Sequence, residues 1–576
     1  MKSLLKFLKD YKKETVLAPL FKLLEASFEL FVPLVMAEII DVGIAGGDSR
    51  YVWKMCILMV ALGIIGLVCS FTAQFFSAKA AVGVAGKLRH ALFAHIQSLS
   101  FTEMDVMGTS TLITRMTSDV NQVQHGVNMV LRLFLRSPCI VFGAMIMAFN
   151  IDVKGALIFV VTIPLLSIVV FGIMAVTMPL YKKTQAALET VLKNTRENLT
   201  GIRVIRAFNK EKEEKARFQE NNSALTQMQK HVGKISGLMN PLTYVIVNGA
   251  TMVLIWQGAF QVDGGAITQG ELIALVNYMS QILVELVKLA NLIVTITKSL
   301  ASAGRVESIL SQKSSMEDPD IAQSGKDKSD VAVRFDHVSL TYAGAGEESL
   351  TDIHFCAKKG ETIGIIGGTG SGKSSLVNMI PRFYDAAKGS VQINGIDVKE
   401  YSLHQLRDKI GVVLQKATLF KGTIRDNLLW GNASATEEEL WEALDISQSR
   451  EFVEKKDDML DAKVSQGGKN LSGGQRQRLT IARALVKKPE ILILDDSASA
   501  LDYATDAKLR KAIKEMKQEI TVFIVSQRAS SIMHADQIIV LDDGKIAGMG
   551  THESLLENCD IYREIYESQF QKVSKA

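Results

Sequence analysis

The chain has 576 residues, of which 48% are hydrophobic and 22% charged, and this balance excludes an intrinsically disordered protein. Its 65 lysines and arginines nearly cancel its 61 aspartates and glutamates, so the formal charge of +4 argues against nucleic-acid binding driven by bulk electrostatics. Five scattered cysteines without a CxxC pair exclude a disulfide scaffold and a zinc ribbon.

The first thirteen residues, MKSLLKFLKDYKK, combine a leucine-rich helical face with five lysines elsewhere. This pattern predicts a helix that lies in the membrane interface, with a solvated basic tail as the alternative. No apolar core leads from this segment to a small-residue cleavage site, which argues against a signal peptide.

Long uncharged stretches dominate the N-terminal half of the chain. Three of them contain 24, 27 and 28 residues, more than the about 20 that a helix needs to cross a bilayer. Three weaker candidates lie around them, one of which includes Arg132 and Arg136. The sequence therefore predicts six membrane spans: Val16–Ile44, Met55–Ala78, about Val127–Ile151, Gly155–Tyr181, Ile235–Val262 and Leu272 to about Thr297.

The loops between these spans differ in charge. With the N-terminus inside, the inner connections hold 21 lysines and arginines and the outer ones only three, which places both termini in the cytoplasm. The inner connections are long and helical in pattern, so we expect the spans to continue beyond the bilayer. Their turns are expected near Ser100–Thr109 and Gly201–Phe208.

The composition and pattern of the sequence change after residue 310. Ser311–Asp330 is a polar linker rich in Ser, Asp and Lys, and from Val331 onward strand-like and helix-like segments alternate. The expected strands are VAVRFDHVSL, TIGIIG, VQINGIDV, EILILDD, TVFIVSQ and QIIVLDDGKIAG. The predicted organisation is a helical membrane domain over 1–310, a linker over 311–330 and an α/β domain over 331–576.

A glycine-rich loop follows the strand Thr362–Ile366 and precedes a helix-like segment. It matches the GxxxxGK[ST] pattern, whose backbone N–H groups converge on phosphates. Lys373 is expected to reach the β- and γ-phosphates and Ser374 to bind Mg²⁺, and Asp495 follows a second apolar strand as the expected Mg²⁺-binding carboxylate. The sequence thus predicts ATP and Mg²⁺ as cofactors. The loop residues are Gly367, Gly368, Thr369, Gly370, Ser371, Gly372, Lys373, Ser374 and Ser375.

Between these two motifs stands LSGGQ, formed by Leu471, Ser472, Gly473, Gly474 and Gln475. With it, the chain resembles a half-transporter of the ATP-binding cassette (ABC) exporter superfamily over essentially its whole length. The resemblance implies a six-span α-helical domain fused to an α/β P-loop ATPase, and an ATP hydrolase coupled to transport. It also implies that LSGGQ touches the nucleotide held by another ATPase domain.

The resemblance implies roles for three further residues. Tyr342 matches the aromatic residue that stacks on adenine, although an ordinary strand tyrosine is the alternative. Gln415 matches the glutamine that binds Mg²⁺ and senses the membrane domain. Asp502 ends the SALD sequence, which matches the loop that crosses to the opposite subunit.

Two positions depart from the family pattern. Asp496 stands where the family usually has the Glu that aligns or deprotonates the attacking water, and Gln527 stands where it usually has His. Loss of one methylene retracts the carboxylate by roughly 1.5 Å, and an amide cannot carry a proton as imidazole does. Both changes weaken catalysis at this chain's nucleotide site, in which Lys373 also takes part. A homodimer would have two such weakened sites, so we expect a heterodimer. Its partner chain would have the Glu and the His, and the LSGGQ of this chain would complete the partner's active site.

The expected function is export of amphiphilic small molecules, of the multidrug type, across a bacterial cytoplasmic membrane. Glu25, Glu29, Glu38 and Glu285 within the spans suggest cationic amphiphiles, although Glu285 and Lys288 are close enough in sequence to pair with each other.

Two alternatives remain open. A lipid or peptide exporter has the same architecture, and a soluble ATPase of the DNA-repair type carries a similar signature. The six predicted spans argue against the second, so membrane lipid is an expected partner and nucleic acid is not.

Overall fold

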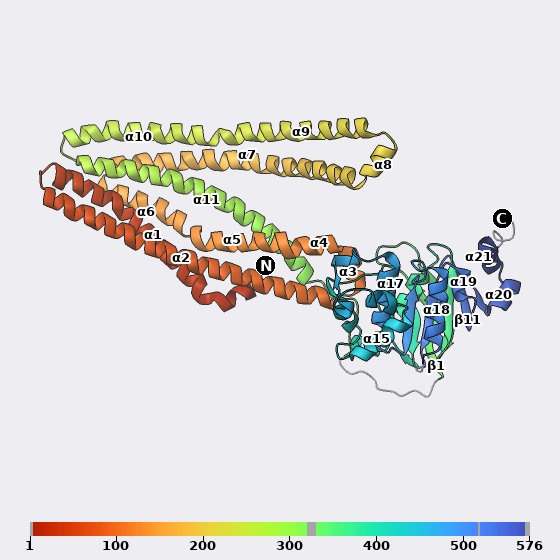
Figure 1. Cartoon of the computed structure of the whole chain (residues 1–576). Helices are drawn as coiled ribbons and strands as arrows, with labels where there is room; N and C mark the ends of the chain where they lie inside the picture. The colour runs from red at the N-terminus through yellow and green to blue at the C-terminus, as the bar shows by residue number, and fades with distance from the viewer. Residues whose placement is uncertain (1–3, 320–329, 517–518, 571–576) are drawn as a thin grey trace. The chain divides into compact units, whose positions relative to one another are not determined.

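The computed structural model describes residues 4–319, 330–516 and 519–570. It separates into two compact units, each described here by itself (Figure 1). The first unit falls within Met1–Gln97 and Ser110–Gln312, and the second within Ser98–Thr109 and Lys313–Ala576. A short segment from the predicted membrane domain thus belongs to the second unit.

In the described residues of the first unit, all regular secondary structure is helical, and short turns connect the helices. Among these residues, five helical stretches are long and apolar enough to cross a membrane, and they contain the second to sixth predicted spans. The helices are η1 (Leu4–Tyr11), α1 (Lys12–Glu38), η2 (Ile39–Ile44), α2 (Ser49–Ser98), α4 (Thr109–Thr114), η3 (Arg115–Asp119), α5 (Val120–Leu133), α6 (Arg136–Ile151), α7 (Val153–Thr200), α8 (Ile202–Ala207), α9 (Glu211–Gly237), α10 (Met239–Asp263) and α11 (Gln269–Leu310).

The first predicted span, Val16–Ile44, is helical as α1 and the π-helical η2. It is not among the five apolar stretches because Lys22, Glu25 and Glu29 lie inside it. Its passage through the membrane therefore stays a prediction. The predicted span over 127–151 is two helices, α5 and α6, separated by a turn at Phe134–Leu135.

The long helices extend well past a bilayer, as expected. The 50 residues of α2 give a helix of about 75 Å, more than twice the hydrocarbon thickness of about 30 Å. The predicted turns are confirmed as two short helices, α3 (Phe101–Met107) and α8, and α7 and α9 on either side of α8 run side by side (Figure 1).

Helix α11 is the centre of the first unit, where it packs against α1, α5, α6, α7 and α10. Its Tyr278 is fully buried and donates a hydrogen bond to the Leu30 carbonyl oxygen at 2.6 Å. Farther along α11, Arg305 binds the buried Asp119 carboxylate, which Arg115 also contacts at 2.8 Å. One carboxylate thus joins η3 to α11.

The second unit contains two main sheets. One is antiparallel, in the order β2-β1-β4-β5, and the other, in the order β12-β11-β3-β10-β9-β6, is parallel except for β12. The strands are β1 (Val331–Leu340), β2 (Leu350–Lys358), β3 (Thr362–Gly367), β4 (Lys388–Ile393), β5 (Ile396–Asp397), β6 (Ile410–Val413), β7 (Gly422–Thr423), β8 (Lys463–Val464), β9 (Ile491–Asp495), β10 (Thr521–Val525), β11 (Gln537–Asp542) and β12 (Lys545–Gly550).

Helices cover the parallel sheet, and every residue of β9 and β10 is buried, as expected for central strands of a covered sheet. The helices of this unit are α3, α12 (Lys373–Met379), α13 (Leu403–Asp408), α14 (Ile424–Leu429), α15 (Glu437–Ile446), α16 (Arg450–Glu454), η4 (Met459–Asp461), η5 (Gln466–Gly468), α17 (Gly473–Val486), α18 (Tyr503–Lys514), α19 (Ala529–Ile532), α20 (His552–Asn558) and α21 (Asp560–Phe570). The predicted fold class, a helical membrane region fused to an α/β ATPase-type domain, agrees with this architecture.

Two predicted strand segments are hairpins. VQINGIDV divides into β4 and β5 at Asn394-Gly395, and QIIVLDDGKIAG divides into β11 and β12 at Asp543-Gly544. All four turn residues have positive φ. Asn-Gly and Asp-Gly favour two-residue hairpin turns with this geometry.

The short helix α3 belongs to the second unit. A capping box formed by Ser100 and Glu103 begins it. Its Phe101 ring lies 4.8 Å from the Phe383 ring, and its Asp105 accepts a hydrogen bond from Tyr384 at 2.6 Å.

The beginning of the predicted linker also contacts the second unit. Ser315 donates its backbone N–H to Glu103, and Asp318 accepts from the Leu403 backbone N–H. Residues 320–329 of the linker lie outside the described residues. In the described part, the segment after residue 312 is therefore packed against the ATPase-type unit.

The buried Asp119 carboxylate gives a stability prediction. Asp119→Asn removes the negative charge between Arg115 and Arg305, so we expect a loss on the order of 2 kcal/mol and a thermal midpoint lower by roughly 4–8 °C. The measurement is thermal unfolding of the detergent-solubilised full chain. Asp10→Asn is the matched control, because Asp10 pairs with Lys87 at the surface and should shift the midpoint by about 1 °C or less. Equal shifts for both variants would contradict the prediction.

Candidate nucleotide site

The glycine-rich loop between β3 and α12 forms the floor of the candidate site. Gly370 and Gly372 have φ values of +86° and +92°, which favour glycine. A Cβ atom at Gly372 would lie 2.8 Å from a Leu350 methyl group and 3.0 Å from the Ser349 carbonyl oxygen. The loop therefore requires glycine here both for its backbone conformation and for the close approach of β2.

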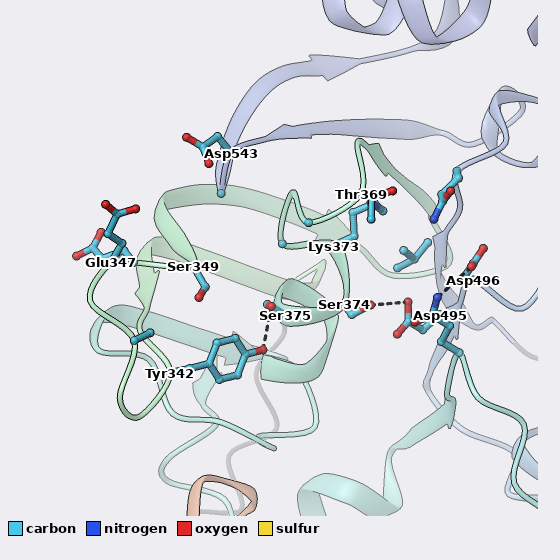
Figure 2. Close-up of a pocket in the computed structure, with 18 of the residues that line it drawn as sticks. Tyr342, Glu347, Ser349, Thr369, Lys373, Ser374, Ser375, Asp495, Asp496 and Asp543 are labelled. Atoms are coloured by element: carbon cyan, nitrogen blue, oxygen red, sulfur yellow. Dashed lines mark hydrogen bonds between the residues drawn. The ribbon is translucent and has the colours of Figure 1, made fainter. Parts of the chain in front are cut away.

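A cavity of about 740 Å³ lies above this loop (Figure 2). It brings together residues that are up to 202 positions apart in the chain, from Tyr342 to Gly544, and includes the loop, the ends of β9 and β10 and Gln415 after β6. Of the predicted site residues, the cavity is lined by Tyr342, Thr369, Gly370, Gly372, Lys373, Ser374, Ser375, Gln415, Asp495, Asp496 and Gln527.

Lys373 is buried at the first position of α12. Its ammonium group donates to the carbonyl oxygens of Gly367 and Gly368 at 3.0 and 2.5 Å and lies 3.4 Å from the Ser371 hydroxyl. In this conformation, Gly367, Gly368 and Ser371 therefore hold the Lys373 ammonium group with their oxygen atoms. Burial lowers the pKa of Lys373, and the nearby charges of Asp496 and Asp495 oppose that change.

Asp495 ends β9 and accepts a hydrogen bond from the Ser374 hydroxyl at 3.1 Å. Burial raises the pKa of Asp495, and the neighbouring Asp496 charge acts in the same direction. Beside it, the Gln415 amide donates to the Asp496 carboxylate at 3.3 Å. A hydroxyl, two carboxylates and an amide oxygen form a set of hard oxygen donors, which fits Mg²⁺.

The two unusual positions lie on the same wall of the cavity. Asp496 has a φ of +46°, a left-handed conformation that Asp tolerates better than most residues. Its backbone N–H donates to the Val525 carbonyl oxygen at 3.0 Å, so it is connected to the end of β10. Gln527 follows two residues after β10 and also lines the cavity.

Tyr342 lies on the opposite side of the loop and donates to the Ser375 hydroxyl at 2.9 Å (Figure 2). The edge of its ring meets the Tyr384 ring, with centroids 5.0 Å apart and an interplanar angle of 86°. Tyr384 in turn donates to Asp105 of α3. A continuous set of contacts therefore links α3 to the nucleotide loop, and sequence analysis did not find Tyr384 because it belongs to no motif.

The LSGGQ residues lie outside the cavity. Ser472 and Gln475 form a capping box at the start of α17, and Ser472 and Gly473 are exposed. The ATPase-type unit thus presents the signature at its surface, away from its own nucleotide loop.

The SALD loop is also outside the cavity. Asp502 caps α18 by accepting from the Thr505 backbone N–H at 2.9 Å. Arg528, next to Gln527, lies over the Tyr503 ring and donates to the carbonyl oxygens of Leu501 and Ser499. Sequence analysis missed this arginine, whose only signal is its position beside Gln527.

Comparisons with known proteins agree with this geometry. Residues 15–286 match the family model described as the ABC transporter transmembrane region, and residues 350–499 match the model described as ABC transporter. The chain is 36% identical, over 98% of its length and 97% of the relative's, to an ABC transporter ATP-binding protein of Mycobacterium tuberculosis.

Two further relatives have names that specify a cargo. One is a candidate multidrug export ATP-binding/permease protein of Bacillus subtilis, 32% identical with 99% of both chains covered. The other is an ATP-dependent lipid A-core flippase of Desulfotalea psychrophila, 33% identical with 91% of both covered.

A solved structure shows the same fold. It is a bacterial Atm1-family ABC exporter with ATP bound, with a TM-score of 0.80, 23% identity, and coverage of 97% of this chain and 98% of the other.

Proposed function

Because the chain belongs to the ABC transporter family and couples ATP hydrolysis to transport, we propose that it is one half of a heterodimeric exporter of amphiphilic small molecules. The observation on which this proposal depends is the joint presence of Asp496 and Gln527 in one nucleotide cavity. We propose that the exporter lies in a bacterial cytoplasmic membrane with both termini and the ATPase unit in the cytoplasm, as the charge of the loops favours.

In the proposed site, the loop amides and Lys373 bind the phosphates of ATP, and Tyr342 stacks on the adenine. Ser374, Gln415 and Asp495 would hold Mg²⁺, which supplies charge neutralisation on the transferred phosphate when bound. The Lys373 ammonium group now donates to the carbonyl oxygens of Gly367 and Gly368. On ATP binding, phosphate oxygens would replace these two acceptors. The chain's own residues thus bind and orient the nucleotide.

The same site is weakly equipped to activate water. The Asp496 carboxylate is one methylene shorter than the Glu usual in the family and is engaged by Gln415 at 3.3 Å. Gln527 can donate a hydrogen bond to a phosphate but cannot accept and return a proton. We therefore propose that this chain's nucleotide site is slow or non-hydrolytic.

The exposed position of the LSGGQ signature supports the proposal of a partner half-transporter. Ser472, Gly473, Gly474 and Gln475 lie away from this chain's own cavity, so their proposed ligand is the nucleotide on the partner half-transporter. That partner is expected to have Glu and His at the positions of Asp496 and Gln527. Asp502 and the SALD loop would lie in the same interface.

Helix α8 supports the same arrangement. None of its residues is buried, and Ile202 and Val204 on α8 and Phe208 just after it are 40%, 60% and 71% exposed. By contrast, Phe101 of α3 contacts Phe383 of this chain's own ATPase unit. We propose that the apolar residues of α8 contact the partner's ATPase unit.

A lipid exporter is the second candidate, since a flippase for lipid A-core is among the relatives. The relative named for multidrug export supports the first candidate at similar identity. Transport of labelled dyes and lipids by the co-purified pair distinguishes the two.

Removal of the unusual carboxylate tests the slow site. Asp496→Ala in the assembled heterodimer should leave the ATPase rate within about twofold of the wild type, because the competent site uses the partner's catalytic residues. The corresponding Glu→Ala change in the partner is the control and should lower the rate on the order of a hundredfold. A large loss on Asp496→Ala would contradict the proposal.

Restoration of the family residues tests the same idea in the opposite direction. The chain purified alone should hydrolyse ATP slowly, and the double change Asp496→Glu with Gln527→His should raise the rate about a hundredfold, since a carboxylate displaced by about 1 Å costs that much. The measurement is phosphate release by the chain in nanodiscs. A wild-type chain that alone turns over about ten ATP per second, a typical enzyme rate, would contradict a heterodimer.

The contact between Tyr384 and Tyr342 gives a prediction for nucleotide binding. Tyr384→Ala removes an aromatic edge contact of about 0.5–1.5 kcal/mol, so the freed Tyr342 should bind adenine nucleotide roughly two- to tenfold more weakly. Tyr384→Phe keeps the ring and should stay near the wild type. Titration with a fluorescent ATP analogue measures both, and equal effects of the two variants would assign the change to the lost Asp105 hydrogen bond instead.

A further inference from the structure

A second cavity, of about 500 Å³, lies in the first unit between α1, α2, α6 and α11. Its polar lining includes Glu29, Glu285 and Lys288. Its apolar lining consists of Val32, Pro33, Met36, Met59, Ile140 and Val284. A cavity of this size, with apolar and polar residues in equal number along its wall, fits a small amphiphile.

Four charges of alternating sign form a row beside this cavity, which we call the charge ladder: Glu29, Arg136, Glu285 and Lys288. Arg136 donates to Glu29 at 2.7 Å and to Glu285 at 2.5 Å, and Lys288 donates to Glu285 at 2.8 Å. The ladder joins α1, α6 and α11. Arg136 was not among the candidates from the sequence.

The two middle members of the ladder are removed from water, since the Arg136 and Glu285 side chains are 8% and 3% exposed. Such a pair is stable only when its remaining hydrogen-bonding groups are also used. Glu285 meets this requirement through Lys288 and through the Ser137 hydroxyl at 2.8 Å, whereas the buried Nε atom of Arg136 has no hydrogen-bond partner among the described residues. The Glu285 carboxylate is thus occupied by protein contacts.

The two end members differ, because the Glu29 and Lys288 side chains are each 43% exposed. Arg136 contacts one Glu29 oxygen, Oε2, which leaves Oε1 for another donor, and the Lys288 ammonium has three donors, of which one is directed at Glu285. The cavity therefore presents one negative and one positive group, each with hydrogen-bonding capacity left.

The charge balance argues against the cationic substrates expected from the sequence. Glu25 is paired with Lys22 at 2.5 Å, so the three carboxylates Glu25, Glu29 and Glu285 are matched by Lys22, Arg136 and Lys288. The pairing of Glu285 with Lys288, the alternative noted from their spacing, is confirmed. A site that has no net charge but presents a negative and a positive group complements a ligand that has one positive and one negative group.

We propose that this cavity binds a zwitterionic amphiphile, with a protonated amine at Glu29, an anionic group at Lys288 and an alkyl body along the apolar wall. The proposal rests on the proposed export function, of which it names the substrate class.

Binding to the full chain in nanodiscs tests the proposal directly. Three radiolabelled probes are each built on an unbranched chain of twelve carbons: N-dodecyl-β-alanine, which is zwitterionic, dodecylamine, which is cationic, and dodecanoate, which is anionic. After subtraction of binding to empty nanodiscs, the zwitterion should bind about tenfold more tightly than either singly charged probe, because it alone gains both charge-assisted contacts. Equal affinities of the three probes would overturn the proposal.

Two neutral substitutions at the ends of the ladder give a crossed pattern that a merely structural role would not produce. Glu29→Gln should weaken the zwitterion and dodecylamine about tenfold and spare dodecanoate, whereas Lys288→Met should weaken the zwitterion and dodecanoate and spare dodecylamine. Glu38→Gln is the matched control on α1, because Glu38 accepts from Tyr51 and is not among the cavity residues. Uniform losses for all probes, or no change, would overturn the proposal.

ATP-dependent uptake into inside-out vesicles, which contain the chain with its co-purified partner, separates this inference from the proposed function. Uptake of N-dodecyl-β-alanine in preference to the other probes supports both. Uptake without preference overturns the zwitterion site and leaves export standing. Preferential binding without ATP-dependent uptake of any probe overturns the proposed export and leaves the binding site standing.

Discussion

Charges that leave water need compensation, and this requirement organises both units of the chain. Asp119 is enclosed by Arg115 and Arg305, Arg136 lies between two glutamates, and the Lys373 ammonium group is held by backbone carbonyl oxygens. The compensating groups come from another turn of the helix, from other helices or, for Lys373, from the end of β3 and the loop after it, so the charge fixes how those elements meet. The same requirement makes these positions sensitive: a carboxylate or an ammonium group that loses its partner has no solvent to replace it.

In the ATPase unit, the contacts that compensate the charges of Lys373 and Asp495 can be replaced by a bound ligand. Lys373 rests on the Gly367 and Gly368 carbonyl oxygens and Ser374 on Asp495, contacts that a phosphate and a cation can replace with stronger, charge-assisted ones. The opposite is true of Asp496, whose carboxylate has only the Gln415 amide within hydrogen-bonding distance among the described groups. These contacts suit the cavity to hold ATP, and they are the physical basis on which we propose that hydrolysis takes place at a partner's site.

Helix α3 shows how the nucleotide cavity can be affected from the helical half of the chain. It groups with the ATPase unit although it lies between two parts of the helical unit in sequence. Its Asp105 meets Tyr384, whose ring positions Tyr342 beside Ser375 of the nucleotide loop. A displacement of α3 would therefore change the adenine side of the cavity through two tyrosine rings. Helix α8 presents exposed apolar residues instead, which is the difference expected if it serves another chain.

Elements with a local signal could be predicted from the amino-acid sequence: the long apolar helices, the short turns at Ser100–Thr109 and Gly201–Phe208, the central strands and the phosphate loop. Each follows from periodicity, uncharged length or a fixed spacing of glycines and Lys373. The errors of the prediction were also local, since Asn394-Gly395 and Asp543-Gly544 were included in strands although they turn the chain. Which charges meet depends on the tertiary structure. Arg136 pairs with residues 107 and 149 positions away, and Tyr384 with one 279 positions away. No local pattern encodes such pairs, because they depend on how helices and loops from distant parts of the chain pack together.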